Sequence, residues 1–263
     1  MLIVGYFLAI LIGMILGLVG GGGSMLTLPL LVYVFKVDII LATGYTMFIV
    51  GLTSAVGSFT YIKNGWVDVK KAMAFGIPSI IVVFVVRNWV VPEIPEVLIS
   101  TDEFQLSQQS FIMLFFALLM LVASVMMIKK TKPIESTADA SMNLKMIVVN
   151  GVVVGGVSGF VGAGGGFLII PALVIFSNLP MREAIGTSLV IITANSIVGF
   201  MGEFGNQNLD WYLLMSVTLA TVIGIFVGIK VSSKIDGAKL KPAFGWFVLV
   251  IGVYIIIKET LLK

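Results

Sequence analysis

The sequence contains neither cysteine nor histidine. Without cysteine there is no disulfide bond, thiol nucleophile or thiolate metal site, and without histidine there is no imidazole proton relay or Ser-His-Asp triad. No other nucleophile stands in a recognisable pattern with a base, and no cluster of carboxylates suggests a metal centre. We therefore expect no enzyme activity, no metal and no cofactor.

Charged residues are also scarce. They make up 11% of the 263 residues, whereas a soluble domain carries roughly a quarter. Hydrophobic residues make up 59%, and the mean hydropathy is +1.15. Because so few charges cannot cover a water-facing surface, the composition predicts a protein embedded in lipid. The net charge of +3 fits basic residues at a cytoplasmic membrane face, and it does not indicate nucleic acid binding.

Eight apolar segments account for most of the chain. They cover residues 2–35, 39–62, 70–91, 109–128, 146–177, 184–204, 211–229 and 241–257. Most are about 20 residues long, which is enough for a helix to cross a bilayer. The sequence therefore predicts an all-α polytopic membrane protein. We expect one membrane repeat at 1–128, a charged cytoplasmic linker at 129–145 and a second membrane repeat at 146–263.

The two halves match when one is shifted by 142 positions. Between residues 17–68 and 159–210, 17 of 52 positions are identical without a gap. Each matched stretch begins with a glycine run inside an apolar segment: GLVGGGGSMLTLP at Gly17–Pro29 and GFVGAGGGFLIIP at Gly159–Pro171. Internal repeats of this type are a common way to build transporters.

Basic residues predict the orientation of the segments. Lysines gather in 63–71, 129–145 and 230–241, which we expect on the cytoplasmic side, with 92–109 and 205–210 outside. If the other six segments each cross the membrane once between these sides, each glycine-broken segment must begin and end on the same side of the membrane. The arm after each glycine run would reach about 16 Å, too short for a hydrocarbon core about 30 Å thick. We therefore expect two inverted-topology repeats, each a re-entrant glycine-broken hairpin followed by three transmembrane helices, with both chain termini external.

Three explanations apply to glycines in such segments. Close helix packing accounts for the scattered ones, such as Gly13 and Gly155. A nucleotide or phosphate loop is excluded, because neither run fits G-x-G-x-x-G and no Lys-Ser/Thr pair follows. The third is irregular backbone at membrane depth, which is tolerated where protein or a water-filled cavity satisfies it. On this basis we predict that the turns Gly20–Ser24 and Gly162–Gly166 approach each other near the bilayer midplane.

Each glycine turn is followed by the N-terminus of a short helix, whose free N–H groups and partial positive charge attract anions. Small polar side chains on the following segments, several at matched repeat positions, would complete a neutral lining. No Asp, Glu or His lies at the middle of a segment, which favours an anion over a cation or proton pathway. The candidate substrate-binding residues are Gly21, Gly22, Gly23, Ser24, Thr46, Ser54, Gly164, Gly165, Gly166, Thr187, Ser188, Asn195 and Ser196.

One basic residue, Arg87, lies inside an apolar segment, one turn from its outer end. We expect its long side chain to extend to the membrane interface, as Arg and Lys side chains near helix ends commonly do. Attraction of anions to the outer mouth of a transport path is the alternative role for this residue.

The paired motif resembles the sulfite exporter TauE/SafE family. The second half carries G-x-x-G-x-G-G-G-x-x-x-x-P, and the first half has Ser24 in place of the last glycine. Ala184–Ser188 (AIGTS) and Ala42–Thr46 (ATGYT) follow at matched positions. The resemblance covers nearly the whole chain. It implies a membrane permease for anionic sulfur compounds or organic acids, such as sulfite, sulfonates and sulfoacetate.

These observations predict a secondary transporter of small anions, with sulfur oxyanions or organosulfonates as the preferred class. Alternating access around a midplane site between the repeats is the expected mechanism. A passive anion channel on the same architecture and a carrier for a small carboxylate remain alternatives. The expected partners are a small anionic substrate and the lipid bilayer of a prokaryotic inner membrane, with no nucleic acid, and a homo-oligomer is left open.

Overall fold

The computed structural model describes residues 2–95, 97–100, 105–128, 144–162, 164–177, 179–203, 209–232 and 237–261. Most of the predicted linker 129–145 lies outside these residues. The first half comprises α1 (Leu2–Val19), the 3₁₀ turn η1 (Gly21–Gly23), α2 (Ser24–Pro29), the π-helical turn η2 (Leu30–Val34), α3 (Ile39–Lys63), α4 (Val69–Val85), the π-helical turn η3 (Val86–Val90) and α5 (Gln108–Ile128). The second half comprises α6 (Leu144–Val161), α7 (Gly166–Phe176), α8 (Met181–Met201), α9 (Trp211–Ser232) and α10 (Gly237–Leu261).

Within the described residues, six helices are long and apolar enough to cross a membrane. They are α1, α3, α4 continued by η3, α5, α8 and α9. Five of them coincide with segments predicted to cross once, and α10 is not in this set. α1 also reaches spanning length, whereas the arm after the first glycine run, Ser24–Val34, is short. The chain is therefore an all-α, multi-pass membrane protein, and the re-entrant form of the hairpins stays a prediction.

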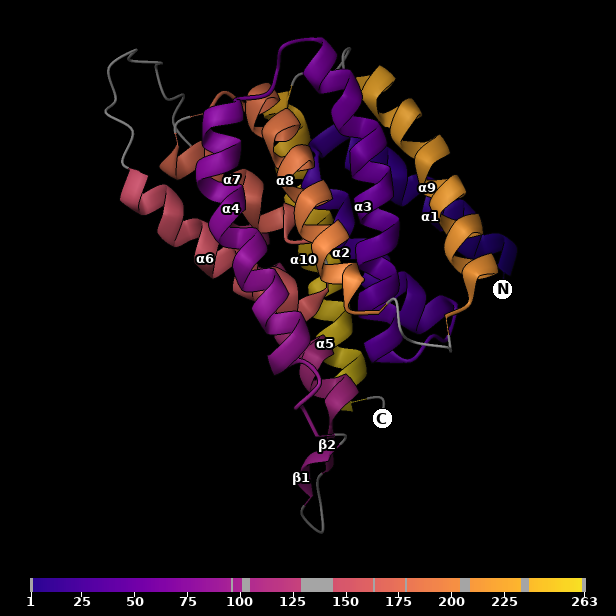
Figure 1. The fold of residues 1–263 in the computed structure, drawn as a ribbon. Coiled ribbons are helices and arrows are strands. Elements are labelled where there is room, and N and C mark those ends of the chain that lie inside the picture. The colour runs from indigo at the N-terminus through magenta and orange to yellow at the C-terminus, as the bar shows by residue number, and fades with distance from the viewer. Residues whose placement is uncertain are drawn as a thin grey trace.

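One small β-hairpin interrupts the helical pattern. β1 (Val97–Ser100) pairs antiparallel with β2 (Gln105–Ser107) within residues 92–109, the stretch expected to connect two helices outside the membrane. Figure 1 shows this hairpin projecting from the ends of α4 and α5, away from the other helices. Four- and three-residue strands leave little hydrophobic periodicity to detect, and an isolated two-stranded hairpin is marginally stable by itself.

The most extensive helix packing joins the two halves of the chain. α1 packs along α9, α4 against α6, α3 against α8, and α5 against α10. In Figure 1 the indigo α1 accordingly lies beside the orange α9. The halves are therefore interlocked, and neither builds a separate helical layer.

Several of these contacts occur twice, at positions related by the shift of 142. Where a glycine of the first half contacts a residue of the second half, the matching glycine of the second half contacts the matching residue of the first half. The contacting pairs are Gly13–Thr221 and Gly155–Ser79, Gly17–Ile225 and Gly159–Val83, Gly20–Ile185 and Gly162–Thr43, Gly44–Glu203 and Gly186–Tyr61, and Gly57–Ile225 and Gly199–Val83. A two-fold relation between the repeats would produce this exchange, so it supports the predicted repeat architecture.

Adjacent glycines on α6 offer a matched test of close packing. A Cβ at Gly155 would lie 2.5 Å from the Ser79 carbonyl oxygen, whereas at Gly156 the nearest atom would be Val82 Cγ1 at 3.7 Å. We expect G155A to lower the free energy of unfolding by about 1–3 kcal/mol through overpacking. G156A should leave it unchanged or raise it by up to about 1 kcal/mol, because alanine favours the helix. Thermal unfolding of the purified proteins measures the difference, and equal effects would contradict the α4–α6 contact.

Candidate functional site

The two glycine turns lie directly against each other. A Cβ on Gly21 would overlap the backbone of Gly166, and a Cβ on Gly166 would overlap the backbone of Gly21. η1 also packs against α7 and α8. The predicted approach of the two turns is therefore confirmed, and it brings the beginnings of α2 and α7 together. Their depth in the bilayer stays a prediction.

Left-handed backbone explains why these turns consist of glycine. Gly20 has φ +74°, and Gly162, Gly164 and Gly165 have φ of +73°, +67° and +68°. Residues with a Cβ adopt this region only at a cost, whereas glycine enters it freely. Gly23, farther along the first turn, packs against the α1 backbone at Leu16. The glycines thus allow the sharp reversal between the two arms of each hairpin.

The two turns differ in the hydrogen-bonding groups that they leave free. Ser24 Oγ donates to the Gly21 carbonyl at 2.6 Å, so the predicted role of Ser24 competes with a bond inside its own turn. The helix that follows, α2, continues directly into η2 and begins after Gly23, which supplies no side-chain cap. α7 has eleven residues and likewise begins after a glycine without a side-chain cap, Gly165. The first N–H groups of a helix lack intrahelical partners, so both turns offer N–H donors to an anion, and only the first turn engages a serine of its own.

Two buried serine hydroxyls lie beside this second turn. A Cβ added to Gly164 would lie 2.9 Å from Ser196 Oγ, and a Cβ added to Gly165 would lie 2.9 Å from Ser158 Oγ. Both serines are at most 1% exposed, and neither hydroxyl has a hydrogen-bond partner among the described residues. A buried polar group without a partner costs on the order of 1–3 kcal/mol. Such groups therefore indicate where a ligand or an ordered water binds.

Ser158 was missed by the sequence analysis. It lies on α6, before the second glycine run, and its counterpart under the shift of 142 is Leu16. Matched repeat positions and the polar residues after each turn do not single out an unmatched serine before the turn. The signal that could have found it is the one-turn spacing to the first glycine of the turn, Gly162.

Further unpartnered oxygens lie on α3. Thr46 Oγ1 and Ser54 Oγ, both predicted, are fully buried and have no hydrogen-bond partner in the part of the chain that the structure describes. Gly51 lies between them and packs against Ser196, which brings α3 to the serine beside the second turn. Ser188, another predicted residue, instead donates its hydroxyl to the Ile185 carbonyl at 2.8 Å.

The two polar atoms of the Asn195 amide differ in their contacts. Its Nδ2 donates to Ser79 Oγ at 2.8 Å, and its Oδ1 has no hydrogen-bond partner within the described ranges. The positions that correspond to this pair in the other half, Thr53 and Thr221, are also joined, with 2.8 Å between the hydroxyl oxygens. Asn195 therefore takes part in a matched helix–helix contact, while its carbonyl oxygen stays available.

Thr187, on α8, contacts the start of α4 instead of the glycine turns. Its Oγ1 accepts a hydrogen bond from the backbone N–H of Asp68 at 3.0 Å, just before α4. The counterpart of Thr187 is Tyr45, whose hydroxyl accepts from the backbone N–H of Asp210, just before α9. Asp68 and Asp210 are themselves related by the shift of 142. These residues tie equivalent helix starts to the opposite half.

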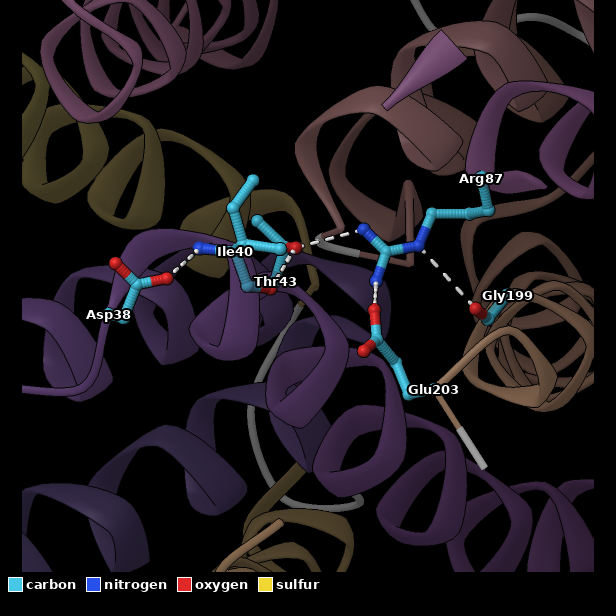
Figure 2. Close-up of polar contacts among 6 residues, drawn as sticks. All are labelled: Asp38, Ile40, Thr43, Arg87, Gly199 and Glu203. Atoms are coloured by element: carbon cyan, nitrogen blue, oxygen red, sulfur yellow. Dashed lines mark hydrogen bonds and ion pairs between the residues drawn. The ribbon is translucent and has the colours of Figure 1, made fainter. Parts of the chain in front are cut away.

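Arg87 is buried, so the prediction that it extends to the interface was wrong. The residue is 6% exposed, and its Nη2 lies 2.9 Å from Glu203 Oε1 (Figure 2). Nη1 donates to Thr43 Oγ1 at 2.8 Å, and Nε donates to the Gly199 carbonyl at 3.4 Å. Glu203 follows α8, so its carboxylate satisfies the guanidinium from a segment remote in sequence. Hydropathy within a single segment cannot reveal such a partner.

Known membrane proteins are similar to this chain over nearly its whole length. The family model for the sulfite exporter TauE/SafE matches residues 6–255. A probable membrane transporter protein of Xylella fastidiosa (strain 9a5c) is 27% identical over 94% of this chain and 91% of its own length. The probable membrane transporter protein MJ0441 of Methanocaldococcus jannaschii is 25% identical over 95% of both chains. The probable membrane transporter protein YdhB of Bacillus subtilis (strain 168) is 25% identical over 89% of this chain and 91% of its own length. No solved structure matches the chain.

Proposed function

The chain belongs to the sulfite exporter TauE/SafE family and is a membrane transporter, and from this premise we propose that it carries small anions through a site where its two glycine turns meet. The observation that carries the proposal is the pair of buried, unpartnered hydroxyls of Ser158 and Ser196 beside the start of α7. Sulfur oxyanions and organosulfonates are the preferred substrates, with a small carboxylate as the alternative.

The chemistry of the site suits an oxyanion. Serine hydroxyls can donate, and the first N–H groups of α7 donate as well, so each can face an oxygen of the same ligand. The helix N-terminus also carries a partial positive charge that favours a negative ligand. Uncharged donors bind an anion less tightly than a buried cationic side chain would. A lower affinity suits a site that must also release its substrate.

The repeat architecture supports alternating access. Matched contacts that exchange the halves, such as Gly20–Ile185 and Gly162–Thr43, are expected if two inverted repeats surround the site. Such repeats can adopt two equivalent arrangements that open to opposite sides of the membrane. We place the transporter in the prokaryotic inner membrane, with both termini external, the repeats at 1–128 and 146–263, and the linker 129–145 in the cytoplasm.

A binding screen tests the proposed substrate class. Purified protein is heated with sulfite, thiosulfate, alkylsulfonates or carboxylates, because a ligand that binds the folded state raises the unfolding temperature. We expect a sulfur oxyanion or sulfonate to stabilise the protein. S158A and S196A should each weaken binding about tenfold, the effect of losing one hydrogen bond to a charged group.

Ser124 provides the matched control for these serine variants. It is equally buried, but it lies on α5 and its hydroxyl donates to the Leu121 carbonyl at 2.7 Å. S124A should therefore retain wild-type anion affinity. The proposed site is contradicted if all three variants bind equally well, and the proposed function is contradicted if the wild-type protein neither binds nor transports any anion.

Flux in reconstituted vesicles separates a carrier from a passive channel. A carrier coupled to a proton or sodium gradient accumulates the labelled anion beyond the level set by the anion gradient and the membrane potential. A channel never exceeds that level, whichever second gradient is imposed. We expect accumulation, because the proposed secondary transporter draws on a second gradient to move its substrate.

A further inference from the structure

The buried ion pair of Arg87 and Glu203 lies next to the glycine site without being part of it. Thr43, which accepts a hydrogen bond from Arg87, packs against Gly162 at the start of the second turn. The Glu203 side chain packs against Gly44. The side chain of Arg87 is 2% exposed and that of Glu203 is 15% exposed. The pair therefore joins the beginning of α3 to the ends of α4 and α8, immediately beside the turn.

The other half has uncharged residues at the two equivalent positions. The shift of 142 pairs Arg87 with Ile229 and Glu203 with Tyr61. Ile229 and Tyr61 lie in one apolar cluster around Leu189 and Ile225. Helix packing at this position thus does not require an ion pair. Replacing a buried ion pair by apolar residues is often neutral or stabilising, so stability alone does not explain the charges at one end.

We propose that Arg87 is a second anion-binding residue, on the path between one side of the membrane and the glycine site, and that Glu203 occupies it while the path is closed. A carboxylate and a sulfonate or sulfite offer a guanidinium the same kind of oxygen acceptor. An arriving anion takes the place of Glu203 on Nη2, while Thr43 keeps its bond to Nη1. The displaced Glu203 moves toward solvent and frees the end of α8 from α4.

The arrangement explains why the carboxylate is less buried than the guanidinium. Glu203 is the partner that must leave, and its 15% exposure gives it a route to water, whereas Arg87 is enclosed by three acceptors. The exchange conserves charge around Arg87, because one anion replaces another. The inference rests on the proposed function for the identity of the ligand, which is probed here with sulfite.

Removing the charge of Glu203 tests the exchange. In E203Q the anion no longer competes with a carboxylate, so the sulfite concentration for half-maximal transport should fall at least about fivefold. In R87Q/E203Q no guanidinium remains, and that concentration should rise about tenfold or more above wild type, the scale of one charge-assisted hydrogen bond. The double variant leaves no unpaired charge, so it tests the role of Arg87 in a neutral site. R182Q is the matched control, because Arg182 stacks over Trp66, outside this cluster.

The absence of native cysteine gives a second, transport-independent measurement. S158C introduces one thiol beside the second turn, and a membrane-impermeant methanethiosulfonate is applied to each side of sealed vesicles. We expect E203Q to speed labelling at least about fivefold from one side only, with no change in R182Q.

The two measurements separate the two proposals. Sulfite transport with unchanged half-saturation in E203Q and in R87Q/E203Q overturns the role of Arg87 and leaves the proposed function intact. Faster labelling in E203Q without transport of any anion by the wild-type protein overturns the proposed function but supports closure by the ion pair. Unchanged labelling without transport overturns both.

Discussion

The G166A variant is expected to lose at least about 90% of anion transport while still inserting into the membrane. A Cβ at this position would overlap the backbone of Gly21 and also meet the side chain of Ile192. Backbone atoms cannot turn aside as a flexible side chain can, so the two turns must move apart. A displacement of about 1 Å at a binding site can cost on the order of a hundredfold in rate.

Gly166 is the position at which a substitution tests the contact between the turns without a second effect on the backbone. Its φ is not in the left-handed region, unlike those of Gly164 and Gly165, so alanine introduces steric overlap without backbone strain. G21A should have a similar effect from the opposite side of the contact. G156A is the control on the same hairpin. If G166A and G156A transport equally well in reconstituted vesicles, contact between the turns is not required for function.

Removing Arg87 alone is expected to cost more stability than removing both members of the ion pair. R87M leaves the carboxylate of Glu203 largely buried without its partner, and breaking a buried ion pair costs about 3–5 kcal/mol. Because Glu203 keeps 15% exposure, we expect the lower end of this range. In R87M/E203M both charges are gone, and the free energy of unfolding should return to within about 1 kcal/mol of wild type.

A double-mutant cycle measures this coupling. The free energy of unfolding is determined for the wild type, R87M, E203M and R87M/E203M under one detergent condition. A coupling free energy near zero, with additive effects of the single variants, would contradict a direct interaction between the two side chains. The T43A variant separates the hydroxyl contact of Nη1 from the ion pair, and we expect it to cost about 1.5–3 kcal/mol, the value of a hydrogen bond to a charged group.

Repeat contacts show how far the sequence comparison reaches. The shift of 142 aligns identical residues such as Pro29 and Pro171, and it also relates pairs of residues that differ in type. The backbone N–H of Asp68 donates to Thr187, and that of Asp210 donates to Tyr45. A threonine and a tyrosine share no side-chain length or shape. The sequence could not show that both hydroxyls accept a hydrogen bond from the start of a helix. This equivalence depends on where each helix start lies in the folded protein.

The sequence by itself determined the membrane class, the helical segments, the matched glycine turns and the relation to a transporter family. Each of these depends on properties summed along the chain or on identities between two aligned stretches. Only the tertiary structure decided which polar atoms are left free. Ser188 bonds to its own helix, Ser158 does not, and Arg87 meets Glu203 across 116 positions of sequence. The physical reason is that hydrogen-bond partners and burial are properties of packed neighbours, which hydropathy and spacing within one segment do not contain.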